Sequence, residues 1–191
     1  MANLCYGCMK DTHGEHECPH CGFSQDTVQA SPFLPLGTKL ENGRYTVGKV
    51  LDNRSDSARY IGYDNKKEKA VSIREFLPKD LFSRSENSLV VTVEKANIKK
   101  FNELKQQFID VGNQIKEIGS YDNLVEVEGV FQDNNTAYIV SDYHEVIPFG
   151  EYVQRSGGKL EWEVARPLIK PLLESLINLT EKGINHFAIC P

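Results

Sequence analysis

Four cysteines near the start of this chain of 191 residues form the pattern with the clearest chemistry. They lie in two C-x-x-C pairs, and two intervening residues let one tight turn direct both thiolates at the same ion. Zinc prefers four such ligands in a tetrahedron, so the spacing predicts a zinc ribbon over residues 1–24 whose fold depends on its metal. The predicted ligands are Cys5, Cys8, Cys18 and Cys21.

The second of the two turns suits a metal better than the first. Pro19 restricts its backbone and Gly22 permits a positive φ directly after the ligand, whereas Met9 takes that place in the first turn. Two disulfides or a redox-active pair are an alternative, and the lack of a signal-peptide core counts against them. Another alternative replaces one cysteine by a histidine, with candidates His13, His16 and His20.

The segment between the two cysteine pairs, residues 9–17, carries one lysine against three acids. Nucleic acids are bound by cationic patches, so this segment argues against a nucleic-acid reader. The formal net charge of -5 provides no overall basic field either. We expect no nucleic-acid partner, and tight binding in a gel shift at low salt would contradict this.

The composition of the whole chain is that of a globular protein, because 40% of its residues are hydrophobic. No apolar run approaches the roughly 20 residues that a membrane span needs, so we expect a cytoplasmic protein without one. Residues 25–37 shift to Ser, Gln, Asp and Pro, with Pro32 and Pro35 on either side of Phe33 and Leu34. This composition predicts a linker with an apolar anchor.

Runs of alternating β-branched and aromatic residues predict strands, and the first three form an antiparallel meander. The predicted strands span residues 44–51, 58–64, 69–77, 89–93, 124–131 and 136–143. Helical spacing predicts helices at residues 101–118, 149–155 and 161–182. The first of these helices has one apolar stripe, formed by Phe101, Leu104, Phe108, Val111, Ile115 and Ile118.

This order of strands and helices resembles the protein-kinase fold, and the local sequences agree. The stretches "GRYTVGKVL" and "ARYIGYDNKKEKAVSIREFLP" resemble the first three strands of bacterial serine/threonine kinases, and "TAYIVSDYHE" resembles their fifth strand and hinge. The stretch "EKGINHFAICP" resembles the end of the long C-lobe helix and the start of the catalytic loop. The resemblance implies an α+β fold, with a five-stranded N-lobe and one long helix at residues 38–143, then a hinge and a partial C-lobe at residues 144–191.

The first departure from this family concerns the loop that covers the phosphates of ATP. Kinases use G-x-G-x-x-G there, because only glycine lets the backbone approach so closely. The matching positions are Asp52, Arg54 and Ser57, and Asp56 adds a second acid. At about 5 Å and an effective dielectric near 20, each unit charge pair with a triphosphate costs on the order of 3 kcal/mol. We therefore expect no ATP binding.

Further departures affect the catalytic groups. The lysine of the V-A-I-K motif is Arg74, a planar fork instead of a point charge, which we expect to pair near Glu75 or with solvent. The helix glutamate that pairs with this lysine in kinases aligns with Val111. The H-R-D motif reads H-F-A, which places Ala188 where the catalytic base is found.

The expected hinge contains Tyr143 and His144, whose backbone can hold an adenine, and Ser141 is a small gatekeeper. The losses fall on separate parts of the phosphoryl-transfer machinery, and no single part compensates for the others. They predict a pseudokinase, a non-catalytic scaffold or regulatory module in signalling with a protein partner. The alternative is an ATP-binding serine/threonine kinase domain, a fragment of a longer chain, that retains nucleotide binding or weak activity.

Overall fold

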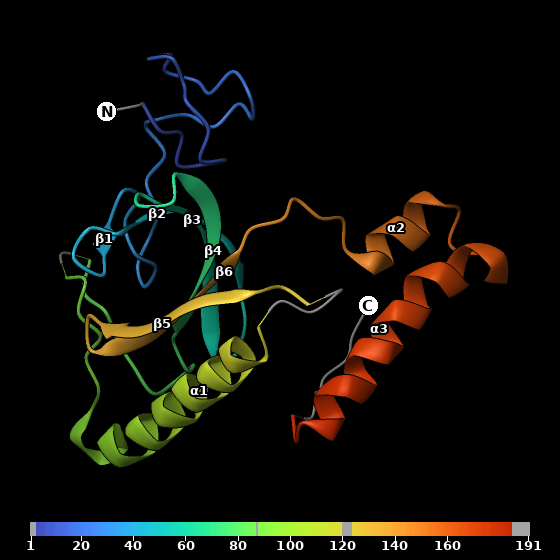
Figure 1. Ribbon diagram of the computed structural model, residues 1–191. Coiled ribbons are helices and arrows are strands. Elements are labelled where there is room, and N and C mark those ends of the chain that lie inside the picture. The colour runs from blue at the N-terminus through green and yellow to red at the C-terminus, as the bar shows by residue number, and fades with distance from the viewer. Residues whose placement is uncertain (1–2, 87, 120–123, 185–191) are drawn as a thin grey trace. The chain divides into compact units, whose positions relative to one another are not determined.

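The computed structural model describes residues 3–86, 88–119 and 124–184. The chain divides into two compact units, Met1–Gly119 with Val127–Tyr143, and Ser120–Glu126 with His144–Pro191. Figure 1 shows the cysteine-rich ribbon, the sheet and one long helix in the first unit, and two helices in the second. Ala188, the position predicted for the missing catalytic base, lies outside the described residues.

The first unit is built on a six-stranded sheet with the order β1-β2-β3-β4-β6-β5, in which every neighbouring pair is antiparallel. The predicted meander is present, and a two-residue strand at its edge was not predicted. The strands are β1 (Lys39–Leu40), β2 (Tyr45–Asn53), β3 (Ser57–Asp64), β4 (Lys69–Phe76), β5 (Val127–Asp133) and β6 (Thr136–Asp142).

A long helix, α1 (Ile98–Ile118), follows a short 3-10 turn, η1 (Lys95–Asn97), and packs on β5 and β6. Phe101 and Phe108 of α1 lie against Phe76 of β4, with ring centroids 5.3 and 5.4 Å apart. These rings join a continuous apolar core formed mainly by alternate residues of the strands. Apart from the added two-residue β1 and the absent strand at residues 89–93, the order of strands and helix is the one that the sequence predicts.

The apolar stripe of α1 differs from the prediction at one position. Val111 is 48% exposed, whereas its neighbour Gly112 is buried against Ile139. A helix turns about 100° per residue, so ten residues after Phe101 it is about 80° short of three full turns. Val111 therefore lies at the flank of the stripe, and Gly112 lies near its centre.

Two other segments bear on the sequence predictions, and the first of them differs from the expectation. Residues 89–93 form no strand, since their only ladder contact is an isolated bridge between Ser83 and Thr92. The apolar anchor expected within residues 25–37 is present, since Leu34 is fully buried. Gln29 accepts a hydrogen bond from the Val50 N–H of β2 at 2.6 Å.

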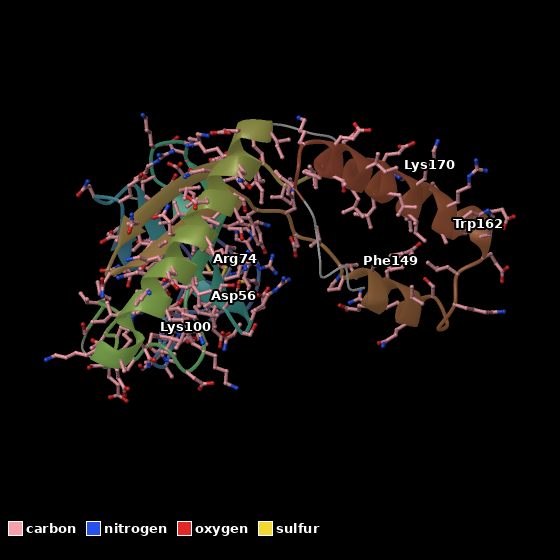
Figure 2. The ribbon with its side chains drawn as sticks, turned by 90° about the horizontal axis from the view of Figure 1, so that it is seen from below. Asp56, Arg74, Lys100, Phe149, Trp162 and Lys170 are labelled. Carbon is pink, nitrogen blue, oxygen red and sulfur yellow. The ribbon has the colours of Figure 1, made fainter. Side chains whose placement is uncertain are left out.

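The second unit contains α2 (Phe149–Arg155) and α3 (Trp162–Glu181), close to their predicted bounds. Within that unit α3 exposes several large apolar side chains, among them Trp162, and Figure 2 labels Trp162 and also Phe149 of α2, which is exposed too. The exposed large apolar residues of α3 are Trp162, Val164, Leu168, Leu172, Leu173 and Ile177. In the described part of the chain, no helix combines the length and the apolarity required to cross a bilayer.

Candidate functional site

The four cysteines predicted as metal ligands come together in the structure. Their Sγ atoms all lie within 4.8 Å of one another, and the pairs Cys5–Cys21 and Cys8–Cys18 are each 3.7 Å apart. A tetrahedral ion about 2.3 Å from each sulfur requires S···S separations of about 3.8 Å, whereas a disulfide requires about 2.05 Å. The cluster therefore fits a metal ion and does not fit two disulfides.

Two similar backbone turns place these sulfurs. The Met9 N–H donates to the Cys5 carbonyl at 2.8 Å, and the Gly22 N–H donates to the Cys18 carbonyl at 2.8 Å. Both closing residues are left-handed, with φ of 59° at Met9 and 68° at Gly22. Gly22 adopts this backbone without a Cβ clash, as the sequence predicts, whereas Met9 adopts it at a cost of about 1 kcal/mol.

The four thiols of the cluster do not all ionise near neutral pH unless a cation binds them. Burial is the main reason why the pKa values of Cys5 and Cys8 are raised, for Cys8 to about 12. Burial also raises the pKa of Cys18, but hydrogen bonds to its sulfur outweigh burial and lower the pKa to about 7. The largest of these contributions is the hydrogen bond from the His20 backbone. A metal ion bound here would have to displace protons from Cys5 and Cys8, so its affinity falls in acid.

The histidines of the ribbon are not part of this cluster. Among the residues that the structure describes, the group with metal-binding geometry consists of cysteines alone. His16 pairs with the Asp26 carboxylate at 2.8 Å, and the rings of His13 and His20 lie 6.4 Å apart. The structure thus favours four sulfur ligands over a set with one histidine.

The first turn of the ribbon also contacts the sheet. The Tyr6 carbonyl accepts a hydrogen bond from the Lys49 N–H of β2 at 2.8 Å, and the Met9 side chain is buried over Gly48. A Cβ at Gly48 would overlap Met9 Cε and the Tyr6 carbonyl, so this approach requires glycine. Because Tyr6 lies between the first two cysteines, the turn that would bind metal is the turn that contacts β2.

The loop between β2 and β3 takes the place of the predicted phosphate-binding loop, and its charged side chains bind one another. Asp52 pairs with Arg59 of β3 at 2.6 Å and with Arg54 at 3.9 Å. Ser57, the third glycine position, is buried at the start of β3. None of these three replacements leaves the open backbone that glycine provides in a phosphate-binding loop.

Arg74 of β4, at the position of the phosphate-pairing lysine, has partners in this loop (Figure 2). Its Nη2 bonds Asp56 Oδ2 at 2.8 Å, and its Nε donates to Ser57 Oγ at 2.8 Å. Its Cζ lies 5.2 Å from the ring centroid of Phe108 in α1. The expected pairing near Glu75 or with solvent is wrong, because successive side chains of a strand point to opposite faces. Val111, the position of the kinase glutamate, brings no charge to Arg74.

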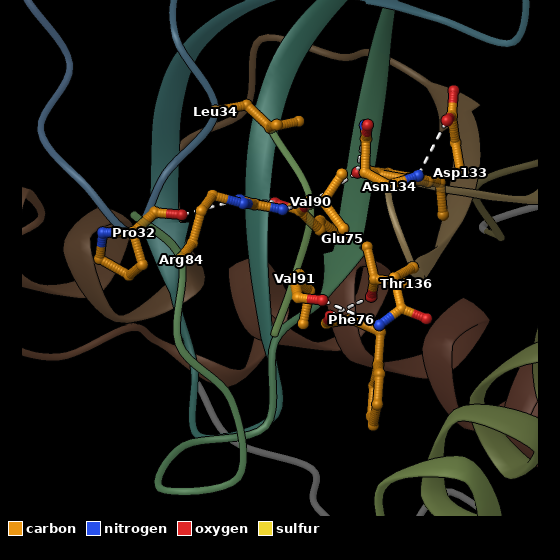
Figure 3. A network of polar contacts seen from close by, with 12 residues as sticks. Pro32, Leu34, Glu75, Phe76, Arg84, Val90, Val91, Asp133, Asn134 and Thr136 are labelled. Carbon is orange, nitrogen blue, oxygen red and sulfur yellow. Dashed lines mark hydrogen bonds and ion pairs between the residues drawn. The ribbon is translucent and has the colours of Figure 1, made fainter. Parts of the chain in front are cut away.

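Glu75 belongs to a buried polar network that the sequence analysis missed (Figure 3). Arg84 and Glu75, 1% and 0% exposed, form an ion pair with an N···O distance of 2.5 Å. Tyr60 and Tyr138 each donate to Glu75 at 2.7 Å, and Arg84 donates to the Pro32 carbonyl at 2.7 Å. Burial, and then the charge of Glu75, raises the pKa of both phenols, so they remain donors. The strand pattern contained a signal, since Glu75 shares its face with apolar Val71 and Ile73.

The expected hinge lies at the end of β6. Ser141 pairs in register with Ser72 of β4, and Tyr143 is the last residue of the first unit, whereas His144 belongs to the second. Asp142, which lies between Ser141 and Tyr143 in the sequence, accepts a hydrogen bond from Lys69 at 2.5 Å. Hydrogen bonds to Asp142 and Glu128 raise the pKa of Lys69, which keeps it charged. The start of the hinge is therefore held by an ion-pair cluster.

The sheet, its helix and the following helices have the fold of a protein-kinase N-lobe and the start of a C-lobe. The "PpkA-294 apo form" matches with a TM-score of 0.74 and 21% identity, over 83% of this chain and 56% of that chain. The PknI kinase domain of Mycobacterium tuberculosis matches with a TM-score of 0.60 and 14% identity, over 83% and 55%. This chain thus spans little more than half of either structure. No family model matches the sequence, and no curated protein does.

Proposed function

We propose that this chain is a non-catalytic, protein-kinase-like module, a pseudokinase, that acts as a regulatory or scaffolding partner of another protein. The observation that supports this most directly is the engagement of Arg74 by Asp56 and Ser57. Kinases need a free cation at this position to pair with phosphates. Enzymatic phosphoryl transfer depends on positioning and charge stabilisation, so a cation bound to its own chain weakens the central element of the site.

Three further positions support the proposal. Val111 replaces the carboxylate that orients the phosphate-pairing side chain, and Asp52 places an acid in the loop. The sequence places Ala188, which cannot accept a proton, at the position of the base. These losses concern substrate positioning, charge and proton transfer separately, so restoring one of them does not restore catalysis.

Phosphoryl transfer can be tested directly. The purified chain is incubated with labelled ATP, magnesium and a generic protein substrate, and we expect no label in the substrate or in the chain. Its thermal unfolding midpoint is then measured with ATP and magnesium in excess, and we expect no increase. Robust autophosphorylation would show that the proposed function is wrong.

The second candidate is an ATP-binding kinase domain in a longer chain, with nucleotide binding or weak activity retained. It is favoured by the kinase fold itself and by Ser141, whose small side chain leaves room at the gatekeeper position. A ligand in large excess over its dissociation constant stabilises a protein by a few kcal/mol. An upward shift of several degrees with ATP would therefore favour this candidate.

We further propose that the cysteine cluster holds a structural zinc ion, and that the four unpaired thiols belong in a reducing compartment such as the cytoplasm. Four thiolates in a tetrahedron and no open position are typical of structural zinc sites. Zinc content of the purified chain, with cobalt substitution to report a tetrahedral thiolate spectrum, tests the assignment. Loss of the metal should unfold residues 3–24.

A protein partner is supported by the apolar surface of α3. Trp162, Leu173 and Ile177 are each more than half exposed, and large exposed apolar patches mark interaction sites. Replacement of Leu173 and Ile177 by serine should weaken capture of a partner by the chain, without an effect on the sheet of the first unit.

A further inference from the structure

Asp56, Ser57 and Arg74 form a closed ring of hydrogen bonds. Arg74 donates from Nη2 to the Asp56 carboxylate and from Nε to the Ser57 hydroxyl, each at 2.8 Å. The Ser57 hydroxyl in turn donates to Asp56 Oδ1 at 2.8 Å. A guanidinium fork is suited to an oxyanion, and a carboxylate and a phosphate present similar oxygens to it.

The backbone holds this ring in place. The Asp56 carbonyl accepts from the Leu77 N–H and the Ser55 carbonyl accepts from the Lys79 N–H, each at 2.9 Å. The loop is therefore fastened to the chain that follows β4. The Arg74 guanidinium also lies over the Phe108 ring of α1. The carboxylate thus reaches Arg74 from a loop whose position is set by other contacts.

A second acid nearby, Asp52 near the end of β2, is engaged differently. It pairs with Arg59 and Arg54, and the described residues show no ion pair between Asp52 and Arg74. Removal of Asp56 would free Arg74, whereas removal of Asp52 would free Arg59. The two acids therefore form a matched pair for an experiment, since they have the same charge and lie four residues apart but bind different cations.

We propose that Asp56 acts as an internal substitute for a phosphate group, and that Arg74 with the Ser57 hydroxyl forms a latent phosphoryl-anion site that this carboxylate fills. The inference deepens the proposed function, because it gives a reason why the kinase-like unit takes no nucleotide. The ligand class is a phosphoryl oxyanion, from a free polyphosphate or from a nucleotide. The negative charge of Asp56 opposes that ligand, and its contact with Arg74 competes with it.

The expected gain is measurable, and the variants should fold. Arg74 and Asp56 are 39% and 49% exposed, and ion pairs at such positions contribute little to stability. Binding of inorganic tripolyphosphate is measured by calorimetry on the whole chain at low salt, for the wild type and for Asp56→Ala. We expect at least tenfold tighter binding to Asp56→Ala, and loss of that gain in the double variant Asp56→Ala with Arg74→Ala.

The control is Asp52→Ala, which removes the same charge and leaves the Arg74 ring intact. Equal gains in Asp52→Ala and Asp56→Ala would show a general charge effect and overturn the inference. It is equally overturned if Asp56→Ala, folded as judged by circular dichroism, gains nothing, or if the gain survives without Arg74. Comparison with ATP distinguishes the sources, since tighter binding of ATP than of tripolyphosphate assigns the site to nucleotides and equal affinity assigns it to free phosphates.

The outcome is separate from the test of the proposed function. Phosphoryl transfer by the wild type would contradict the proposed function whatever Asp56→Ala binds. Failure of Asp56→Ala to gain affinity would contradict only the inference, since other losses would still explain an inactive kinase-like unit.

Discussion

The cysteine cluster and the Arg74 site are both organised around charge, but they are completed in opposite ways. Four thiols in the ribbon face one another, and their full ionisation requires a cation from outside the chain. The guanidinium of Arg74 already has a carboxylate from its own chain, contributed by Asp56. The difference shows that a suitable residue type does not make a binding site. A site takes an external ion only where the chain leaves its charge uncompensated.

The largest effect on stability is expected from removing cysteines of the cluster in the ribbon. Replacement of Cys18 and Cys21 by serine removes two of the four ligands and should abolish metal binding, which contributes on the order of 10 kcal/mol in small zinc domains. Hydrogen exchange should then lose protection across residues 3–24, and the metal content should fall to zero. The double variant His13→Ala with His20→Ala is the control and should keep its metal. Retention of the ion in the serine variant would contradict the ligand assignment.

The next largest effect distinguishes two ion pairs that start from neighbouring residues of β4. Arg84→Met leaves Glu75 buried without its charge partner and should cost about 3–5 kcal/mol in urea unfolding. Arg74→Met breaks a half-exposed pair and should cost less than about 1 kcal/mol. Similar losses of unfolding free energy in Arg84→Met and Arg74→Met would mean that burial does not determine how much each ion pair contributes to stability. The pair Arg84→Met with Glu75→Leu should recover only part of the loss, because no buried charge remains but the buried Tyr60 and Tyr138 hydroxyls lose their shared acceptor.

A smaller effect tests the contact between the ribbon and the sheet. Met9→Ala removes a buried side chain from Gly48 and should lower the unfolding free energy by about 2 kcal/mol. The metal should remain bound, because the cysteines are unchanged. Val28→Ala is the control, since this side chain is 89% exposed. If Met9→Ala and Val28→Ala unfold at the same urea concentration, the ribbon and the sheet are energetically independent.

The smallest effect concerns acid and Asp64 of β3. Burial raises its pKa, but hydrogen bonds from the Lys67 and Lys66 N–H groups and from Arg44 outweigh burial, and the net shift is downward. A carboxylate with a lowered folded-state pKa stabilises the protein above its ordinary pKa of 3.8 and loses that contribution as the pH falls below it. The stability difference between the wild type and Asp64→Asn should thus be constant near neutral pH and shrink below about pH 4. An unchanged difference at pH 3 would contradict the assignment. Because the variant and the wild type share the ribbon, metal loss in acid cancels in the comparison.

Much of the fold could be predicted because its signals are local. Strand alternation and helical spacing located β2, β3, β4, β6, α2 and α3 to within a few residues. The weaker predictions failed where local pattern and packing disagree. Four of residues 89–93 are β-branched, yet Val90 is exposed and only a single bridge forms. Val111 continues a 3-4 spacing, but the helical period places Gly112 in the core.

The sequence by itself predicted the cysteine cluster that could hold a metal ion, since two C-x-x-C turns direct their thiolates through contacts within a few residues. It also showed which residues stand at the positions matched to kinase motifs, because a residue type is visible without coordinates. Only the tertiary structure decided what replaces the lost contacts. Arg74 and Asp56 are 18 residues apart, and Arg84 reaches the Pro32 carbonyl across 52. Such pairings depend on strand register and on which face of a strand a side chain occupies, and no local pattern specifies the distance between them.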